Sequence, residues 1–140
     1  MIPAAPLDVA SLSTTVLFID DNPVDLDVWS RGLRECSPAY TTLTASDIRS
    51  GLNLYQSQKV DCVILDLDLP GESGFEALFA LVPNRQRPSI AVIVLTKLPY
   101  QNLYELVMHN GAFACLHKRH TSAAALDQAI QKAIASIPRS

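Results

Sequence analysis

Long hydrophobic runs, a positively charged start and a strong net charge are all missing from this chain of 140 residues. Apolar stretches such as residues 90–95 are far shorter than the roughly 20 residues that a transmembrane helix needs. Residues 1–15 have neither an opening positive charge nor a continuous apolar core, so we do not expect a signal peptide. We therefore predict a soluble protein with no membrane partner and interpret residues 1–14 as a flexible leader.

Cysteine is also scarce, with Cys36, Cys62 and Cys115 as the complete set. The number is odd and no two of them have C-x-x-C spacing, which argues against a disulfide framework and against a zinc site. We expect a reducing, cytoplasmic environment, with the three thiols in or near the core.

The net charge of −3 conceals an uneven distribution along the chain. Residues 1–76 contain 12 acidic and 4 basic side chains, whereas residues 77–140 contain 2 acidic and 7 basic ones. Because neither set forms a run, the pattern favours neither an acidic tail nor a nucleic-acid-binding arm. The length fits one domain and excludes most multidomain enzymes.

Five short segments have the apolar or alternating composition of β-strands. They are residues 16–19, 40–45, 60–65, 90–95 and 113–116. Helical spacing predicts helices between and after them, over 47–55, over 99–109 with a stop at Gly111, and over 121–137. The first helix begins at Asn22 as cap and Pro23 as first residue, and we place Val24, Val28 and Trp29 on one side of it.

Strands alternating with helices predict an α/β fold: a single doubly wound (βα)5 domain, residues 15–137, with a five-stranded parallel sheet and a tail at 138–140. No output domain is expected after the last helix. Ligands of such sheets bind beyond the carboxyl ends of the strands. The side chains at that edge would be Asp20, Asp21, Asp66, Thr96 and Lys118.

This group of side chains suggests phosphoryl chemistry with a metal. Three close carboxylates repel one another unless a cation neutralises them, and Mg²⁺ prefers such oxygen ligands. Thr96 and Lys118 would contact phosphoryl oxygens, and a carboxylate at the centre of the edge would act as the nucleophile.

Five motifs in order resemble the receiver domain of two-component response regulators, the CheY-like family with a flavodoxin-like fold. They are Ile19-Asp20-Asp21-Asn22, Leu65-Asp66-Leu67-Asp68-Leu69-Pro70 with Gly74, Ile93-Val94-Leu95-Thr96, Gly111-Ala112, and Lys118. Asp21, Asp66, Thr96 and Lys118 follow one another at intervals of 45, 30 and 22 residues, close to the intervals of the family.

The resemblance implies that Asp66 accepts a phosphoryl group from a sensor histidine kinase or phosphotransfer protein. Asp21 and Asp66 would bind Mg²⁺ directly, Asp20 mainly through water, and Asp68 through its backbone carbonyl. Phosphorylation would alter protein contacts on the fourth helix, fifth strand and fifth helix, a face that would also suit a homodimer. No enzymatic activity beyond autodephosphorylation is expected.

Three residues depart from the family pattern. Cys115 occupies a position that is usually Tyr or Phe, and Phe113 would share its face if the strand is regular. Lys97 follows Thr96 where a small residue is usual, and Arg119 follows Lys118 where a cis-proline is usual. We predict either a strained cis Lys118–Arg119 bond or a rearranged loop, because a non-proline cis bond costs about 2.5–4 kcal/mol.

These departures leave a second interpretation open, a receiver-fold interaction module whose phosphorylation is uncoupled from output. A third is a small doubly wound phosphatase or a nucleotide- or flavin-binding enzyme. The sequence opposes the third, since Asp20-Asp21-Asn22-Pro23 stands where a glycine-rich phosphate loop would be needed.

Overall fold

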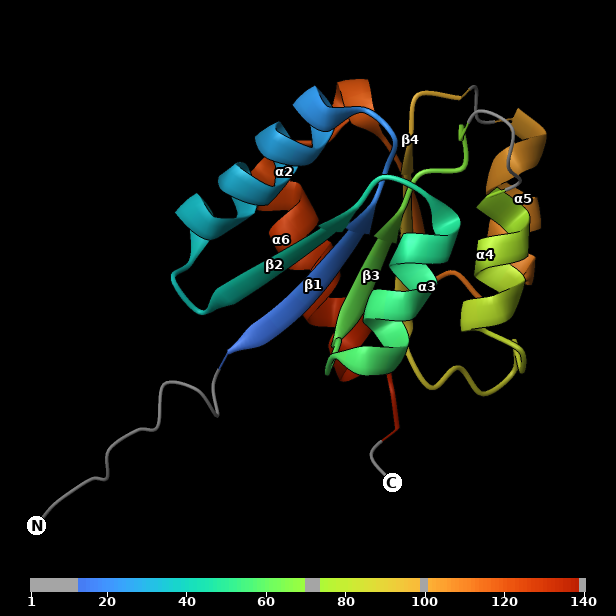
Figure 1. Ribbon diagram of the computed structural model, residues 1–140. Coiled ribbons are helices and arrows are strands. Elements are labelled where there is room, and N and C mark those ends of the chain that lie inside the picture. The colour runs from blue at the N-terminus through green and yellow to red at the C-terminus, as the bar shows by residue number, and fades with distance from the viewer. Residues whose placement is uncertain (1–12, 70–73, 99–100, 139–140) are drawn as a thin grey trace, which may run out of the picture.

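A parallel sheet in the strand order β2-β1-β3-β4-β5 forms the centre of the computed structural model (Figure 1), which describes residues 13–69, 74–98 and 101–138. The strands are β1 (Thr14–Ile19), β2 (Tyr40–Ala45), β3 (Cys62–Leu65), β4 (Ala91–Thr96) and β5 (Ala114–His117). The predicted doubly wound sheet is confirmed. Strand β1 begins at Thr14, one residue inside the segment that we interpreted as a leader.

The central strands are buried on both faces, which explains why their sequences are almost continuously apolar. Every residue of β3 and β4 is buried. The strands at the edges, β2 and β5, are less covered, and their side chains alternate in character. Burial on two faces thus explains why β3 and β4 are continuous apolar runs, whereas β2, at 40–45, shows only a weaker alternation of apolar and polar residues.

Helices cover both faces of the sheet (Figure 1). Helices α2 (Pro23–Cys36) and α6 (Ala123–Ala135) pack on one face against Phe18, Ile64 and Ile93. Helices α3 (Ile48–Ser57), α4 (Gly74–Leu81) and α5 (Gln101–His109) pack on the other. Within the described ranges, no helix is long and apolar enough to cross a bilayer.

Helix α2 begins as predicted, but it presents a different face to the core. The Asn22 side chain accepts hydrogen bonds from the backbone N–H groups of Val24 and Asp25 at 2.9 and 3.2 Å. Trp29 and Leu33 are buried, whereas Val24 and Val28 are 67% and 56% exposed. Our placement of these two valines beside Trp29 was therefore wrong, because the core stripe follows the i, i+4 pair Trp29 and Leu33.

Three other predictions differ from the structure. Cys36 is exposed at the end of α2, while Cys62 and Cys115 are buried as expected. The helical periodicity does not single out α4, a short and almost wholly apolar helix. Helical spacing would place Leu103, Leu106 and Val107 on one face of α5, but Leu106 is 48% exposed whereas Val107 is buried. The predicted helix start at Pro99, most of the leader and Pro70 of the second motif lie outside the described residues.

Candidate functional site

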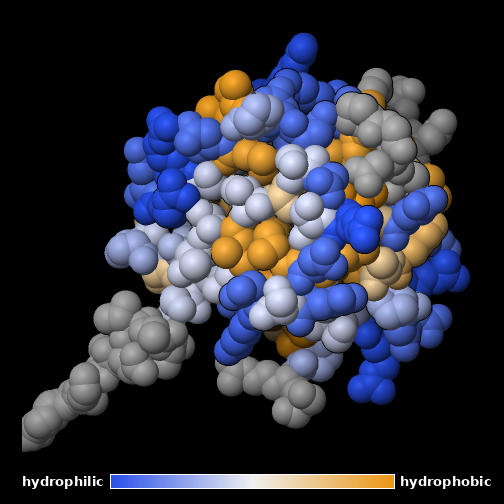
Figure 2. Space-filling model, in the orientation of Figure 1, coloured by the Kyte–Doolittle hydropathy of each residue, from blue (hydrophilic) through white to orange (hydrophobic). Residues whose placement is uncertain are grey.

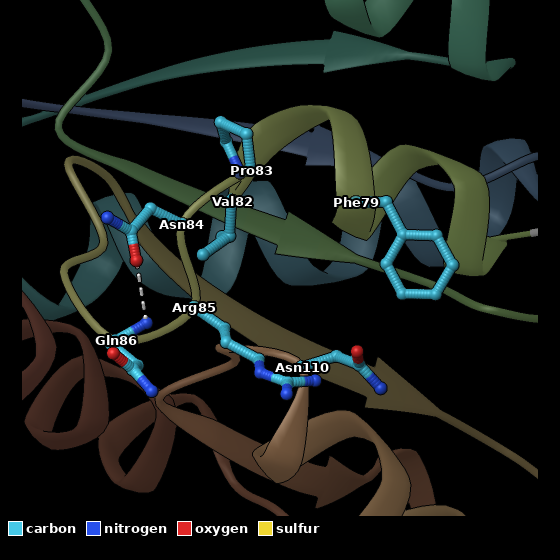
Figure 3. A pocket seen from close by; sticks show the side chains of 7 residues that line it. All are labelled: Phe79, Val82, Pro83, Asn84, Arg85, Gln86 and Asn110. Atoms are coloured by element: carbon cyan, nitrogen blue, oxygen red, sulfur yellow. Dashed lines mark hydrogen bonds between the residues drawn. The ribbon is translucent and has the colours of Figure 1, made fainter.

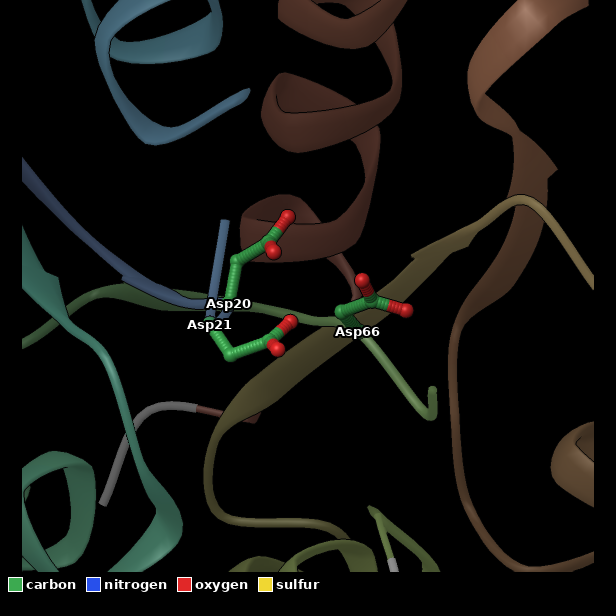
Figure 4. Close-up of side chains that lie close together, drawn as sticks. All are labelled: Asp20, Asp21 and Asp66. Carbon is green, nitrogen blue, oxygen red and sulfur yellow. The ribbon is translucent and has the colours of Figure 1, made fainter. Parts of the chain in front are cut away.

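The first strand and the third strand lie side by side, and this brings three carboxylates together. Ile19 of β1 is in register with Leu65 of β3, and the Asp66 N–H donates to the Ile19 carbonyl at 3.0 Å. Asp20 and Asp21 follow directly after β1, and Asp66 follows directly after β3 (Figure 4). Carboxylate oxygens of these three residues lie within 4.8 Å of one another.

A lysine ammonium is inserted among these acids. Lys118 Nζ lies 2.6 Å from Asp20 Oδ2, 2.8 Å from Asp25 Oδ2 and 2.9 Å from Asp66 Oδ2. Its side chain is only 5% exposed. An ammonium group has three donors, and here all three are directed to carboxylates. Charge-assisted hydrogen bonds therefore hold the Lys118 ammonium in a region that water hardly reaches.

Burial and pairing act against each other on the pKa values of this group. Burial alone would lower the pKa of Lys118, but the hydrogen bonds to Asp20, Asp25 and Asp66 raise it above its usual value. Burial raises the pKa of Asp20 even though Lys118 stabilises its charged form. Asp25 is more exposed to solvent, and although burial acts to raise its pKa, the interactions with Lys118 and Lys97 together outweigh burial and lower the pKa. Lys118 thus stays charged at neutral pH.

Asp66 lies at the centre of the site with both carboxylate oxygens engaged. Oδ2 contacts Lys118, and Oδ1 accepts a hydrogen bond from the Asp68 backbone N–H at 3.0 Å. The Asp68 side chain is exposed. The Asp66 side chain therefore closes a tight turn that brings the Asp68 backbone close to the acids.

Thr96 closes β4, next to β3, and is fully buried. Its hydroxyl oxygen accepts a hydrogen bond from the Leu98 N–H at 3.2 Å. Thr96 is also in register with His117 of β5, so Lys118 follows directly beside it. The strand ends therefore bring Thr96 and Lys118 to the edge that holds the acids.

Sequence reasoning missed Asp25. This residue stands in the first turn of α2, four residues after Asp21, and its carboxylate binds Lys118. Lys97 Nζ lies 3.6 Å from the same Asp25 oxygen. The available signal was the position of an acid in the first turn of a helix that begins at this edge of the sheet. That position alone equally suits a charge that stabilises the helix dipole.

The loop after β5 is rearranged, as one of our two alternatives predicted. The Lys118–Arg119 peptide is trans, and residues Lys118–His120 form a 3₁₀ turn. His117 Nδ1 accepts a hydrogen bond from the Arg119 N–H at 3.1 Å. The side chain of His117 thus satisfies a backbone group in a loop that has no proline.

Cys115 and Phe113 pack on opposite sides of the sheet. Cys115 is buried with Val94 and Val107 on the side of α5, whereas Phe113 packs with Ile93 and Leu126 on the side of α6. Our placement of Phe113 on the face of Cys115 was wrong, because β5 begins only at Ala114 and strand alternation does not extend back to residue 113.

Gly74 allows α4 to lie against the turn that carries Asp66. A Cβ atom at position 74 would lie 2.5 Å from Leu67 Cα and 2.9 Å from Leu67 Cδ2. We expect Gly74→Ala to lower the free energy of unfolding by about 1–3 kcal/mol, because the backbone at Leu67 must move. Urea denaturation would measure the loss.

Gly32→Ala is the control for this substitution, since its Cβ would meet only the Ala123 Cβ at 3.1 Å and alanine favours the helix. We expect it to change the free energy of unfolding by less than about 1 kcal/mol. Equal effects of the two substitutions would contradict a specific contact at Leu67.

A hollow elsewhere on the molecule contains none of these groups (Figure 3). It lies among the loops that lead into β4 and β5, at the opposite end of those strands. It is lined by Phe79, Val82, Pro83, Asn84, Arg85, Gln86 and Asn110. We place the functional site at the carboxyl ends of the strands, where the charged groups converge.

Known proteins share both the sequence pattern and the fold. Residues 16–131 match the model of the response regulator receiver domain. The chain is 35% identical over 82 residues to the probable transcriptional regulatory protein TcrX of Mycobacterium tuberculosis, a match that covers 59% of this chain and 33% of TcrX. It is 28% identical over 81 residues to protein PilH of Pseudomonas aeruginosa, covering 58% of this chain and 65% of PilH. The chain thus spans about a third of TcrX.

Solved structures agree with these matches. A response regulator receiver domain protein from Clostridium thermocellum superposes with a TM-score of 0.74 at 32% identity, over 87% of this chain and 94% of that one. The chemotaxis response regulator CheY4 of Vibrio cholerae superposes with a TM-score of 0.73 at 25% identity, over 86% and 98%. The arrangement of strands and helices is therefore that of known receiver domains.

Proposed function

Because the chain belongs to the response regulator receiver family of two-component signalling, we propose that it accepts a phosphoryl group on Asp66. One observation carries this proposal. Asp66 is a buried carboxylate at the end of the central strand β3, within 4.8 Å of two other acids and 2.9 Å from the Lys118 ammonium. A nucleophile, an acidic cluster and a cation for phosphoryl oxygens thus meet at one point.

The donor set suits Mg²⁺, a hard cation that prefers oxygen ligands. Asp21 and Asp66 would hold the ion directly and Asp20 mainly through water, with the backbone carbonyl of Asp68 as a further ligand. When bound, Mg²⁺ supplies positive charge that offsets repulsion between the carboxylates and the incoming phosphoryl group.

The residues of the chain would perform the transfer by positioning and charge. A carboxylate oxygen of Asp66 attacks phosphorus, an O–P bond forms, and the N–P bond of the donor phosphohistidine breaks with its electron pair left on the histidine. Lys118 donates to a phosphoryl oxygen. The Thr96 hydroxyl, which accepts from Leu98, still has its own proton to donate to another.

The donor would be a sensor histidine kinase or a phosphotransfer protein in the cytoplasm. Val24 and Val28, exposed by 67% and 56%, lie on α2 beside the acids, and apolar atoms are visible at the surface over this helix (Figure 2). They suit a partner helix that brings its histidine to Asp66. The output surface, and the interface of a homodimer, would use α5, β5 and α6, where Tyr104 and Leu106 of α5 are about half exposed. We propose no nucleic-acid partner and no turnover beyond autodephosphorylation.

Acetyl phosphate tests the function without a kinase. The protein is incubated with acetyl phosphate and Mg²⁺, or with acetyl phosphate and EDTA, and its intact mass is measured. We expect the mass of one phosphoryl group to be added with Mg²⁺ only, on the peptide that contains Asp66. An unmodified protein, or an adduct on another peptide, would contradict the proposal.

The same sample separates a working switch from an uncoupled interaction module, the alternative that Cys115, Lys97 and Arg119 suggest. Hydrogen exchange at residues 97–125 is compared before and after phosphorylation. A working switch changes exchange in this region, because phosphorylation shifts the populations of two conformations. An adduct with unchanged exchange would favour the uncoupled module.

A further inference from the structure

Lys118 has no spare donor in this structure, although the proposed function requires it to bind a phosphoryl group. Its three contacts are Asp20, Asp25 and Asp66, all within 2.9 Å. To donate to a phosphoryl oxygen, the ammonium must release at least one carboxylate. The identity of that carboxylate determines how strongly the unmodified site resists phosphorylation.

Asp25 is the carboxylate that costs least to release. Asp20 and Asp66 have side chains that are 10% and 6% exposed, so each would lose its cation in a region with little water. Asp25 is 18% exposed and has a second cation nearby, since Lys97 Nζ lies 3.6 Å from the same oxygen that Lys118 contacts at 2.8 Å. Lys97 is itself about half exposed, with freedom to move closer.

We propose that Asp25 is a positioning residue that competes with the phosphoryl group for Lys118, and that Lys97 takes over Asp25 when Lys118 turns to the phosphoryl group. The inference rests on the proposed function, which supplies the phosphoryl group. It gives Lys97 a role through Asp25 and makes the first turn of α2 sensitive to phosphorylation.

The test measures the affinity for beryllofluoride, which mimics a phosphoryl group on a carboxylate, in the presence of Mg²⁺. The fluorescence of Trp29, the single tryptophan of the chain and a residue of α2, serves as the signal. We expect Asp25→Asn to bind about fivefold more tightly, because a neutral amide holds the Lys118 ammonium less strongly than a carboxylate does, even in a partly screened pair. Lys97→Met should bind about twofold more weakly, and Lys97→Arg should bind like the unaltered protein.

The decisive measurement is Lys97→Met in the Asp25→Asn background. If Lys97 acts by holding Asp25, its substitution has no effect there. Asp27→Asn is the matched control, since it removes the same charge from the same helix. Among the ion pairs of the described residues, Asp27 pairs only with the exposed Arg31. It should leave the affinity unchanged.

Three results would overturn the inference. They are an Asp25→Asn affinity equal to that of the unaltered protein, an equal gain in Asp27→Asn, and a Lys97→Met loss that is the same in both backgrounds. The third would mean that Lys97 contacts the phosphoryl group itself. If the unaltered protein, shown to be folded by thermal unfolding, bound no beryllofluoride, the proposed function would fail and this inference with it.

Discussion

Asp66→Asn is expected to abolish Mg²⁺-dependent phosphorylation by acetyl phosphate completely. The amide that replaces the carboxylate is not a nucleophile and carries no charge for a metal ion. The fold should persist, because Asn has nearly the same shape and its carbonyl oxygen can still accept from the Asp68 N–H. Lys118 also keeps its contacts with Asp20 and Asp25. Intact mass after incubation measures the adduct.

Asp68→Asn is the matched control for this substitution. It makes the same chemical change two residues away, on a side chain that is exposed. We expect this variant to form the adduct in the same yield as the unaltered protein, because the proposed role of Asp68 in binding uses its backbone. A full adduct on Asp66→Asn, or none on Asp68→Asn, would contradict our assignment of the phosphoacceptor.

Lys118→Met should have the largest effect on stability, with the free energy of unfolding in EDTA lowered by about 3–5 kcal/mol. The substitution leaves Asp20, Asp25 and Asp66 without the ammonium that all three contact. Asp20 and Asp66 are buried, so water replaces little of the lost interaction. Urea denaturation measures the loss.

Mg²⁺ should raise the free energy of unfolding of Lys118→Met by more than it raises that of the unaltered protein. A cation that binds the folded state stabilises it by mass action, and the variant has more uncompensated negative charge to attract one.

The control for the stability loss of Lys118→Met is Lys132→Met on the exposed side of α6, which should change the free energy of unfolding by less than about 0.5 kcal/mol. Similar losses in the two variants would mean that Lys118 has no special electrostatic role.

The order of the elements was predictable because local pattern reflects burial. Strands buried on two faces need continuous apolar sequence, as in β3 and β4, and α6 shows its buried face as Leu126, Ile130 and Ala133. The α4 helix escaped detection because it is apolar on nearly all sides and only eight residues long. The exposed valines of α2 were misplaced because two apolar stripes on one helix look alike in sequence.

The uneven charge of the chain also has a structural explanation in part. Asp20, Asp21, Asp25 and Asp66 come from the acidic part, residues 1–76, whereas Lys97 and Lys118 come from the basic part. The fold brings these groups together through ion pairs between Lys118 and three acids and between Lys97 and Asp25. The charge difference between the two parts is thus partly neutralised within one site.

By itself, the sequence determined the parallel sheet and the residues that end its strands, because both depend on local apolar pattern and on the spacing of Asp20, Asp66, Thr96 and Lys118. Only the tertiary structure decided which side chains Lys118 contacts. An ammonium on a long side chain can reach any acid within a few ångströms, and that set depends on how close the first turn of α2 comes to the Lys118 side chain, which follows β5. Asp25 belongs to the site for that reason, although its place in the sequence equally suits an ordinary helix start.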